Sequence, residues 1–153
     1  MSQNTRELVA ELGEQLGLPT LLADDEDLAV LNLENSPPIS LSIDDDEAVV
    51  LAALLGKAPE GKAELAEELL ASNLFWRDTG GATLSMERYG RDVFLARRWA
   101  PSELPDSGAL AKALEGFADL AVKWVVVLER LAAPDGGSDQ AEHIPTDLLN
   151  QRA

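Results

Sequence analysis

Two runs of acidic residues are the densest groups of side chains that could do chemistry in this sequence. They are Asp24–Asp27 and Asp44–Glu47. Calcium-binding loops place oxygen ligands at alternate positions and need a glycine for a sharp turn, and neither run has this pattern. Each run flanks a predicted strand. We therefore interpret both runs as solvated turns and predict no metal site.

Other reactive groups are scarce. The single histidine, His143, lies in a polar C-terminal segment, where no rigid frame would hold a catalytic base. The absence of cysteine excludes disulfides, thiolate zinc sites and cysteine nucleophiles. Gly80-Gly81 precedes a predicted strand and not a helix, so we interpret it as a turn and not as a phosphate cradle. The sequence therefore predicts no catalytic residue, no cofactor and no enzyme.

The charge of the chain restricts its partners. Its 153 residues include 12 Lys and Arg against 28 Asp and Glu, which gives a net charge of −16. Such a chain repels phosphate backbones and anionic membrane surfaces, so we expect neither nucleic acid nor membrane as a partner. Arg97-Arg98, beside Trp99, is expected to pair with nearby acids. No apolar run approaches the roughly 20 residues that span a bilayer, and the first residues do not resemble a secretory signal, so we expect a soluble intracellular protein.

The elements that would position a site follow from hydrophobic periodicity and turn residues. Helices are predicted over residues 4–16, 62–73 and from 106 or 107 to about 131; strands are predicted over 28–33, 39–43, 48–55, 82–87 and 93–99. Segment 48–55 is apolar throughout, which favours a strand covered on both faces, although a helix stays possible.

The order of these elements predicts an α+β fold, with a mainly antiparallel five-stranded sheet and three helices in the order α-β-β-β-α-β-β-α. Residues 1–133 form one predicted domain, and 134–153 a disordered tail. The second helix and the strand after Gly81 both carry half-apolar faces. These faces are either ordinary core or an interface with another copy or partner.

Four stretches carry a resemblance to a known family. They are Leu12–Pro19, Leu69–Trp76, Thr79–Met86 and Gly90–Arg98, and the closing helix through Phe117 and Trp124 also fits. In motif order, size and acidity the chain resembles the CesT/Tir-chaperone family, the class I chaperones of bacterial type III secretion. The resemblance covers residues 4–131, and the tail departs from the shorter family pattern.

The resemblance implies a function and a set of residues. Family members are homodimers of the bacterial cytoplasm that hold the N-terminal segment of a secreted effector in an extended form and deliver it to the secretion ATPase, without a cofactor. The implied dimer interface comprises Leu65, Leu69, Leu70, Leu84 and Met86. The implied client-binding residues are Leu8, Leu12, Leu16, Leu31, Leu33, Ile39, Leu41 and Ile43. All of them also fit positions in an ordinary core.

Two other functions stay open at this point. One is an adaptor or regulatory domain of the same fold that binds proteins outside secretion. The other is a small hydrolase that uses acidic residues such as Asp44–Asp46, which would require a carboxyl group with a raised pKa in a cleft.

Overall fold

The chain forms a single sheet with helices on one side and at both ends. The computed structural model describes residues 4–18, 21–22 and 28–134. The elements are α1 (Thr5–Gln15), β1 (Leu28–Leu31), β2 (Ile39–Ile43), β3 (Val49–Lys57), α2 (Ala63–Ser72), η1 (Leu74–Trp76), β4 (Thr83–Met86), β5 (Asp92–Trp99), η2 (Pro101–Glu103) and α3 (Ser107–Ala132). The predicted order of three helices and five strands is confirmed.

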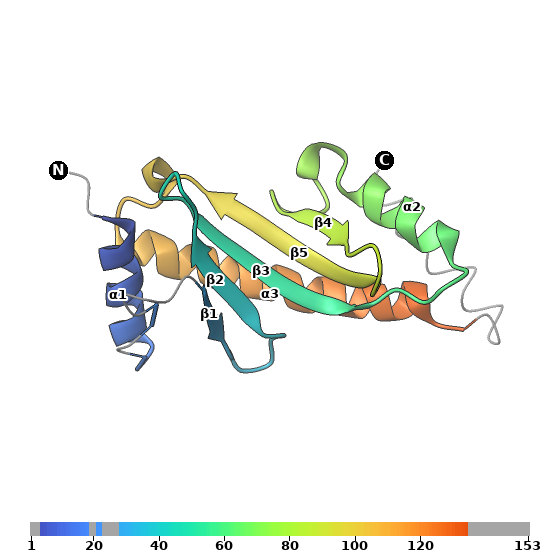
Figure 1. The fold of residues 1–153 in the computed structure, drawn as a ribbon, viewed down its shortest axis with the longest axis horizontal. Helices are drawn as coiled ribbons and strands as arrows, with labels where there is room; N and C mark the ends of the chain where they lie inside the picture. Colours follow the sequence, from blue (N-terminus) through green and yellow to red (C-terminus); the bar gives the residue numbers. More distant parts are fainter. Residues whose placement is uncertain (1–3, 19–20, 23–27, 135–153) are drawn as a thin grey trace.

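The sheet is antiparallel throughout, with strand order β1-β2-β3-β5-β4. In Figure 1, α3 runs along the length of the sheet behind it, α1 lies at one end, and α2 lies beside β4 at the other. The two edge strands, β1 and β4, have four residues each. The opposite, near face of the sheet in Figure 1 has no described helix over it.

Strand β2 shows how the alternating pattern sorts side chains between the two faces. Ile39 and Leu41 are buried in the core, whereas Ser40 and Ser42 lie on the other face and are half-buried. Strand β3 does not have the predicted cover on both faces, because its Leu54 side chain is 46% exposed. A β-bulge between Leu54 and Gly56 shifts the register near the end of this strand.

Helix α3 buries a seam of apolar residues that recur at spacings of three and four. Asp106 caps its first turn by accepting a hydrogen bond from the backbone N–H of Ala109. The seam residues Leu110, Leu114, Phe117, Ala121, Trp124 and Leu128 are all buried. Phe117 packs edge-to-face on Trp99 of β5, with ring centroids 6.2 Å apart, which joins the helix to the sheet.

The N-terminal part differs from the expectation only at its boundaries. Asn4 caps α1 by accepting from the backbone N–H of Arg6. The first strand ends at Leu31, two residues earlier than predicted, and Leu33 follows it in the connection to β2. The predicted tail lies outside the described residues after Pro134, so its prediction is not tested.

Candidate protein-binding surfaces

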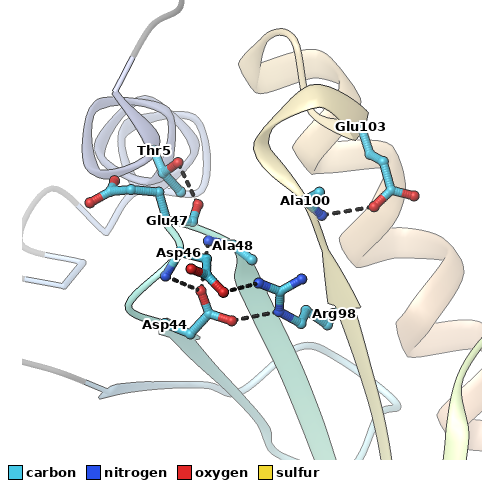
Figure 2. A network of polar contacts seen from close by, with 8 residues as sticks. All are labelled: Thr5, Asp44, Asp46, Glu47, Ala48, Arg98, Ala100 and Glu103. Carbon is cyan, nitrogen blue, oxygen red and sulfur yellow. Dashed lines mark hydrogen bonds and ion pairs between the residues drawn. The ribbon is translucent and has the colours of Figure 1, made fainter.

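A polar network fastens the turn between β2 and β3 to β5 (Figure 2). The carboxylate of Asp44 accepts hydrogen bonds from the backbone N–H groups of Asp46 and Ala48, at 2.9 and 3.0 Å. Its other oxygen accepts from Nε of Arg98 at 2.5 Å, and Arg98 also reaches Asp46. The turn therefore holds one side chain of β5 in a fixed position.

These contacts lower the pKa of Asp44, first through the hydrogen bond from Arg98 and then through that from the Ala48 amide. The carboxyl group stays ionised, so it lacks the raised pKa that a hydrolase acid would need. Thr5 of α1 adds a third element, because its hydroxyl donates to the Glu47 carbonyl at 2.7 Å. We interpret the network as structural.

The two arginines at the end of β5 behave differently. Arg98 pairs with nearby acids as predicted. For Arg97 the prediction is wrong, because its guanidinium donates to the carbonyl of Gly80 and lies over the ring of Trp99, 4.7 Å from the ring centroid. The cause is the strand period: neighbouring side chains point to opposite faces of the sheet.

The residues predicted for a dimer interface divide into two groups. Leu65, Leu69 and Leu84 are buried within the single chain, where α2 packs on β4. Met86 is half-buried, and Leu70 is 71% exposed. In the isolated chain, Leu70 is therefore the predicted interface residue that is most available to a second copy.

The sequence prediction missed three large apolar residues next to Leu70. Leu74, Phe75 and Trp76 form η1, and all three side chains are more than half exposed. Phe75 and Trp76 have positive φ angles, 52° and 54°, which bulky residues rarely adopt. We call Leu70, Leu74, Phe75, Trp76 and Met86 the α2–η1 patch. Three consecutive large apolar residues directly after a helix were the sequence signal for it.

Asn73 closes the free edge of β4 beside this patch. Its side-chain amide donates to the Leu84 carbonyl at 2.9 Å, and its side-chain oxygen accepts from the Leu84 N–H at 2.8 Å. The asparagine thus takes the place of a neighbouring strand at this position. Among the described residues, no backbone hydrogen bond closes the free edge of β1. Unpaired edge groups of this kind invite another chain.

The predicted client-binding residues mostly lie in the core. Leu8, Leu12, Leu31, Ile39 and Leu41 are buried, Leu33 and Ile43 are half-buried against the core, and Leu16 is exposed. The side chains of the five buried residues are covered by the chain's own α3 and sheet. The exposed apolar residues of β1 are instead Leu28 and Val30, each 55% exposed.

Leu28 and Val30 belong to a continuous surface that no described helix covers, which we call the open face. It is the face of the sheet turned away from α3. Its apolar members are Leu28, Val30, Val50, Ala52, Leu54, Phe94 and Ala96; its polar members are Ser40, Ser42, Thr83, Ser85 and Arg98.

The strand register arranges the open face in rows. One row runs across the whole sheet through Val30, Ser40, Ala52, Ala96 and Thr83. None of the twelve open-face side chains is fully buried, and Arg98 is the single charged one among them. The alternation of each strand was visible in the sequence, but which set of side chains α3 would cover was not.

Two features that the sequence singled out lie outside the described residues. The acidic run Asp24–Asp27 lies wholly outside them, as does His143. In the part of the chain that the structure describes, no three His, Cys, Asp or Glu side chains form a group that could hold a metal ion. Among those same residues, no helix is long and apolar enough to cross a membrane.

Solved structures share this fold. A chain in the crystal structure of the ExsC–ExsE complex superimposes with a TM-score of 0.67 at 22% identity, covering 84% of this chain and 97% of that one. A chain in the HopA1–SchA chaperone–effector complex gives a TM-score of 0.63 at 18% identity, over 78% of this chain and 91% of that one. At these identities the likeness establishes the fold.

Sequence relatives identify the family. The Tir chaperone of Citrobacter freundii is 26% identical over 150 residues, which cover 98% of this chain and 93% of that protein. The Tir chaperone of Escherichia coli O157:H7 matches at the same identity and coverage. The model of the Tir chaperone protein (CesT) family matches residues 7–125. The chain therefore belongs to the Tir chaperone protein (CesT) family.

Proposed function

We propose that this protein is a type III secretion chaperone, which binds an extended segment of a secreted effector and keeps it soluble in the bacterial cytoplasm. It acts as a homodimer, without a cofactor and without catalysing a reaction, and passes its client to the secretion ATPase. The open face is the observation that carries the proposal. Family membership and the chaperone–effector complex among the similar structures support it.

The open face suits an extended client. A polypeptide segment that adds to the β1 edge gains backbone hydrogen bonds, and its apolar side chains then lie next to Leu28 and Val30. Hydroxyl side chains such as Ser40 and Ser42 offer additional hydrogen bonds without the desolvation cost of a charge. A surface of this kind recognises apolar, strand-forming sequence and does not require a folded partner.

The client test is co-expression with the neighbouring genes, followed by identification of the protein that co-purifies. We expect a secreted protein, held through its N-terminal segment. Val30→Asp should abolish this co-purification while the circular dichroism spectrum stays unchanged, because Val30 is exposed. Leu41→Asp would place a charge in the core and unfold the chain, so it cannot serve as the test.

Asn32→Asp, which adds the same charge at another exposed position just after β1, is the matched control and should keep the client bound. Capture of a protein that is not secreted would contradict the secretion role. Undiminished capture by the Val30→Asp variant would contradict the role of the open face.

The α2–η1 patch is the proposed surface for the second copy. Exposed aromatic and leucine side chains of this kind form the centres of protein interfaces, where their removal from water stabilises the complex. Burial of a large apolar side chain contributes about 1.5–3 kcal/mol. With Leu65, Leu69 and Leu84 in its own core, each chain offers Leu70 and the η1 residues to its partner.

Light scattering tests this interface. Leu70→Glu should convert the dimer to a folded monomer, since it places a charge in an apolar contact. Ala71→Glu introduces the same charge at the next exposed position of α2 and is the control. A Leu70→Glu variant that stays dimeric would contradict the proposed interface.

A further inference from the structure

A recessed site lies on the side of the sheet opposite the open face. It is a hollow of about 250 Å³ between β5, the Gly80 turn and one side of α3. Trp99, Phe117 and Leu120 line it with apolar surface, and Arg97 and Lys112 with positive charge. Small-molecule sites commonly occupy roughly 300–1,000 Å³, so this hollow fits a side chain or two of a peptide better than a metabolite.

Arg97 is held in position before any ligand arrives. Its Nη1 donates to the Gly80 carbonyl at 2.8 Å, and its guanidinium lies over the Trp99 ring. Gly81, with φ of 90°, leaves it room: a Cβ on Gly81 would lie 2.9 Å from the guanidinium carbon. A glycine is thus needed at position 81 for two reasons: the positive φ angle, and the close approach of the Arg97 guanidinium.

The two cations of the hollow lack acidic partners in a strongly acidic molecule. Among the described residues, neither Arg97 nor Lys112 forms an ion pair with a carboxylate, whereas Lys57 and Arg98 do. The chain carries 28 acidic residues against 12 basic ones, so two cations beside one hollow form a local positive site in an acidic molecule. A ligand with one carboxylate would complement them, while a polyanion would be repelled by the net charge of −16.

The apolar wall of the hollow offers a second contact, for an apolar group of the ligand. On α3, Gly116 is exposed and presents no side chain, and a Cβ there would meet no atom within 4 Å. This gap lets a ligand reach Phe117 and Leu120 next to the two cations. The site thus offers an anion contact and an apolar contact side by side.

We propose that this hollow binds an acidic anchor of a partner polypeptide, namely an aspartate or glutamate followed by a leucine-sized apolar side chain. The inference rests on the proposed function in that the partner is a polypeptide held in an extended form. It adds a position at which the client must be acidic, on the face of the sheet that the open face does not reach.

The probe is the peptide acetyl-Ser-Asp-Leu-Ser-amide, titrated into the full chain while amide and indole signals are followed by NMR. We expect saturable shifts at Gly80, Gly116 and the Trp99 indole. Replacement of the peptide's aspartate by asparagine, or Lys112→Gln in the protein, should weaken binding by roughly tenfold, as loss of a charged hydrogen bond does. Gly116→Leu should fill the hollow and abolish binding, with the helix retained in circular dichroism.

Lys123→Gln removes the same charge from an exposed position of α3 outside the hollow and should bind as the unmodified chain does. The proposal is overturned if the asparagine peptide binds equally well, if Gly116→Leu still binds, or if no shift appears at millimolar peptide. Capture of an effector together with any of these results leaves the chaperone function standing and rejects the anchor site.

Discussion

Asp44 ties the turn between β2 and β3 to β5, a strand more than 50 residues away in the sequence, which makes it a useful residue for testing stability. Arg98 and two backbone N–H groups bind its charged form, and this holds its pKa below the ordinary value of 3.8. A group with a lowered folded-state pKa contributes stability above its unfolded pKa, and the contribution is lost as the pH falls through the folded pKa. The pH range over which this contribution to stability is lost therefore begins near pH 3.8 and extends below it.

Asp44→Asn should lower the stability at pH 7 and make the variant less sensitive to acid below pH 4. The measurement is urea unfolding at pH 7 and at steps down to pH 3. Asp45→Asn removes the same charge from an exposed neighbour outside the network of Figure 2, so it should leave the acid sensitivity as it is. Equal acid sensitivity in Asp44→Asn and the unmodified chain would show that this ion pair does not govern the response.

Individual residue roles were the least predictable part of the site. Leu41 and Val30 are both apolar residues in alternating strands, yet Leu41 is fully buried and Val30 is more than half exposed. The strand period tells which residues share a face, but not which face the later helix α3 covers. That choice depends on packing between segments far apart in the sequence. Arg97 and Arg98 likewise lie on opposite faces of the sheet, Arg97 on the side of α3 and Arg98 on the open face.

At the level of elements, the sequence predicted almost every helix and strand, because each has a strong local signal. The spacing of Leu110, Leu114 and Phe117 predicts α3, and the alternation around Leu41 predicts β2 within the same bounds as observed. The η1 segment was missed, since Phe75 and Trp76 adopt positive φ angles that their residue types disfavour.

The free edge of β4 allows a test of how a single side chain stabilises a whole strand. Asn73→Ala should remove both hydrogen bonds to the Leu84 backbone and destabilise the fold by about 1–3 kcal/mol, at roughly 0.5–1.5 kcal/mol per bond. Hydrogen exchange of the Leu84 amide should become faster in this variant. Asn32→Ala, in the exposed connection after β1, is the control. Unchanged exchange at Leu84 would mean that the Asn73 side chain does not protect this amide.

The whole molecule combines two opposing properties: a net charge of −16 and apolar surfaces that no described element covers. The charge keeps single copies soluble despite the open face. A field of this sign should also favour basic clients, while the Arg97 hollow is proposed to accept one local negative charge. Binding of a partner would thus depend both on its charge and on the spacing of its apolar side chains.

The same charge opposes the proposed dimer, and this leads to a prediction about salt. Two copies of −16 repel each other, and the repulsion is screened over about 30 Å at 0.01 M ionic strength but about 8 Å at 0.15 M. The apolar contact of the α2–η1 patch is not weakened by screening. Dimerisation, measured by sedimentation at 10 and 150 mM NaCl, should therefore be tighter at the higher salt concentration. A dimer that loosens as salt is added would instead be held by ion pairs across the interface, and the α2–η1 patch would then not be its main contact.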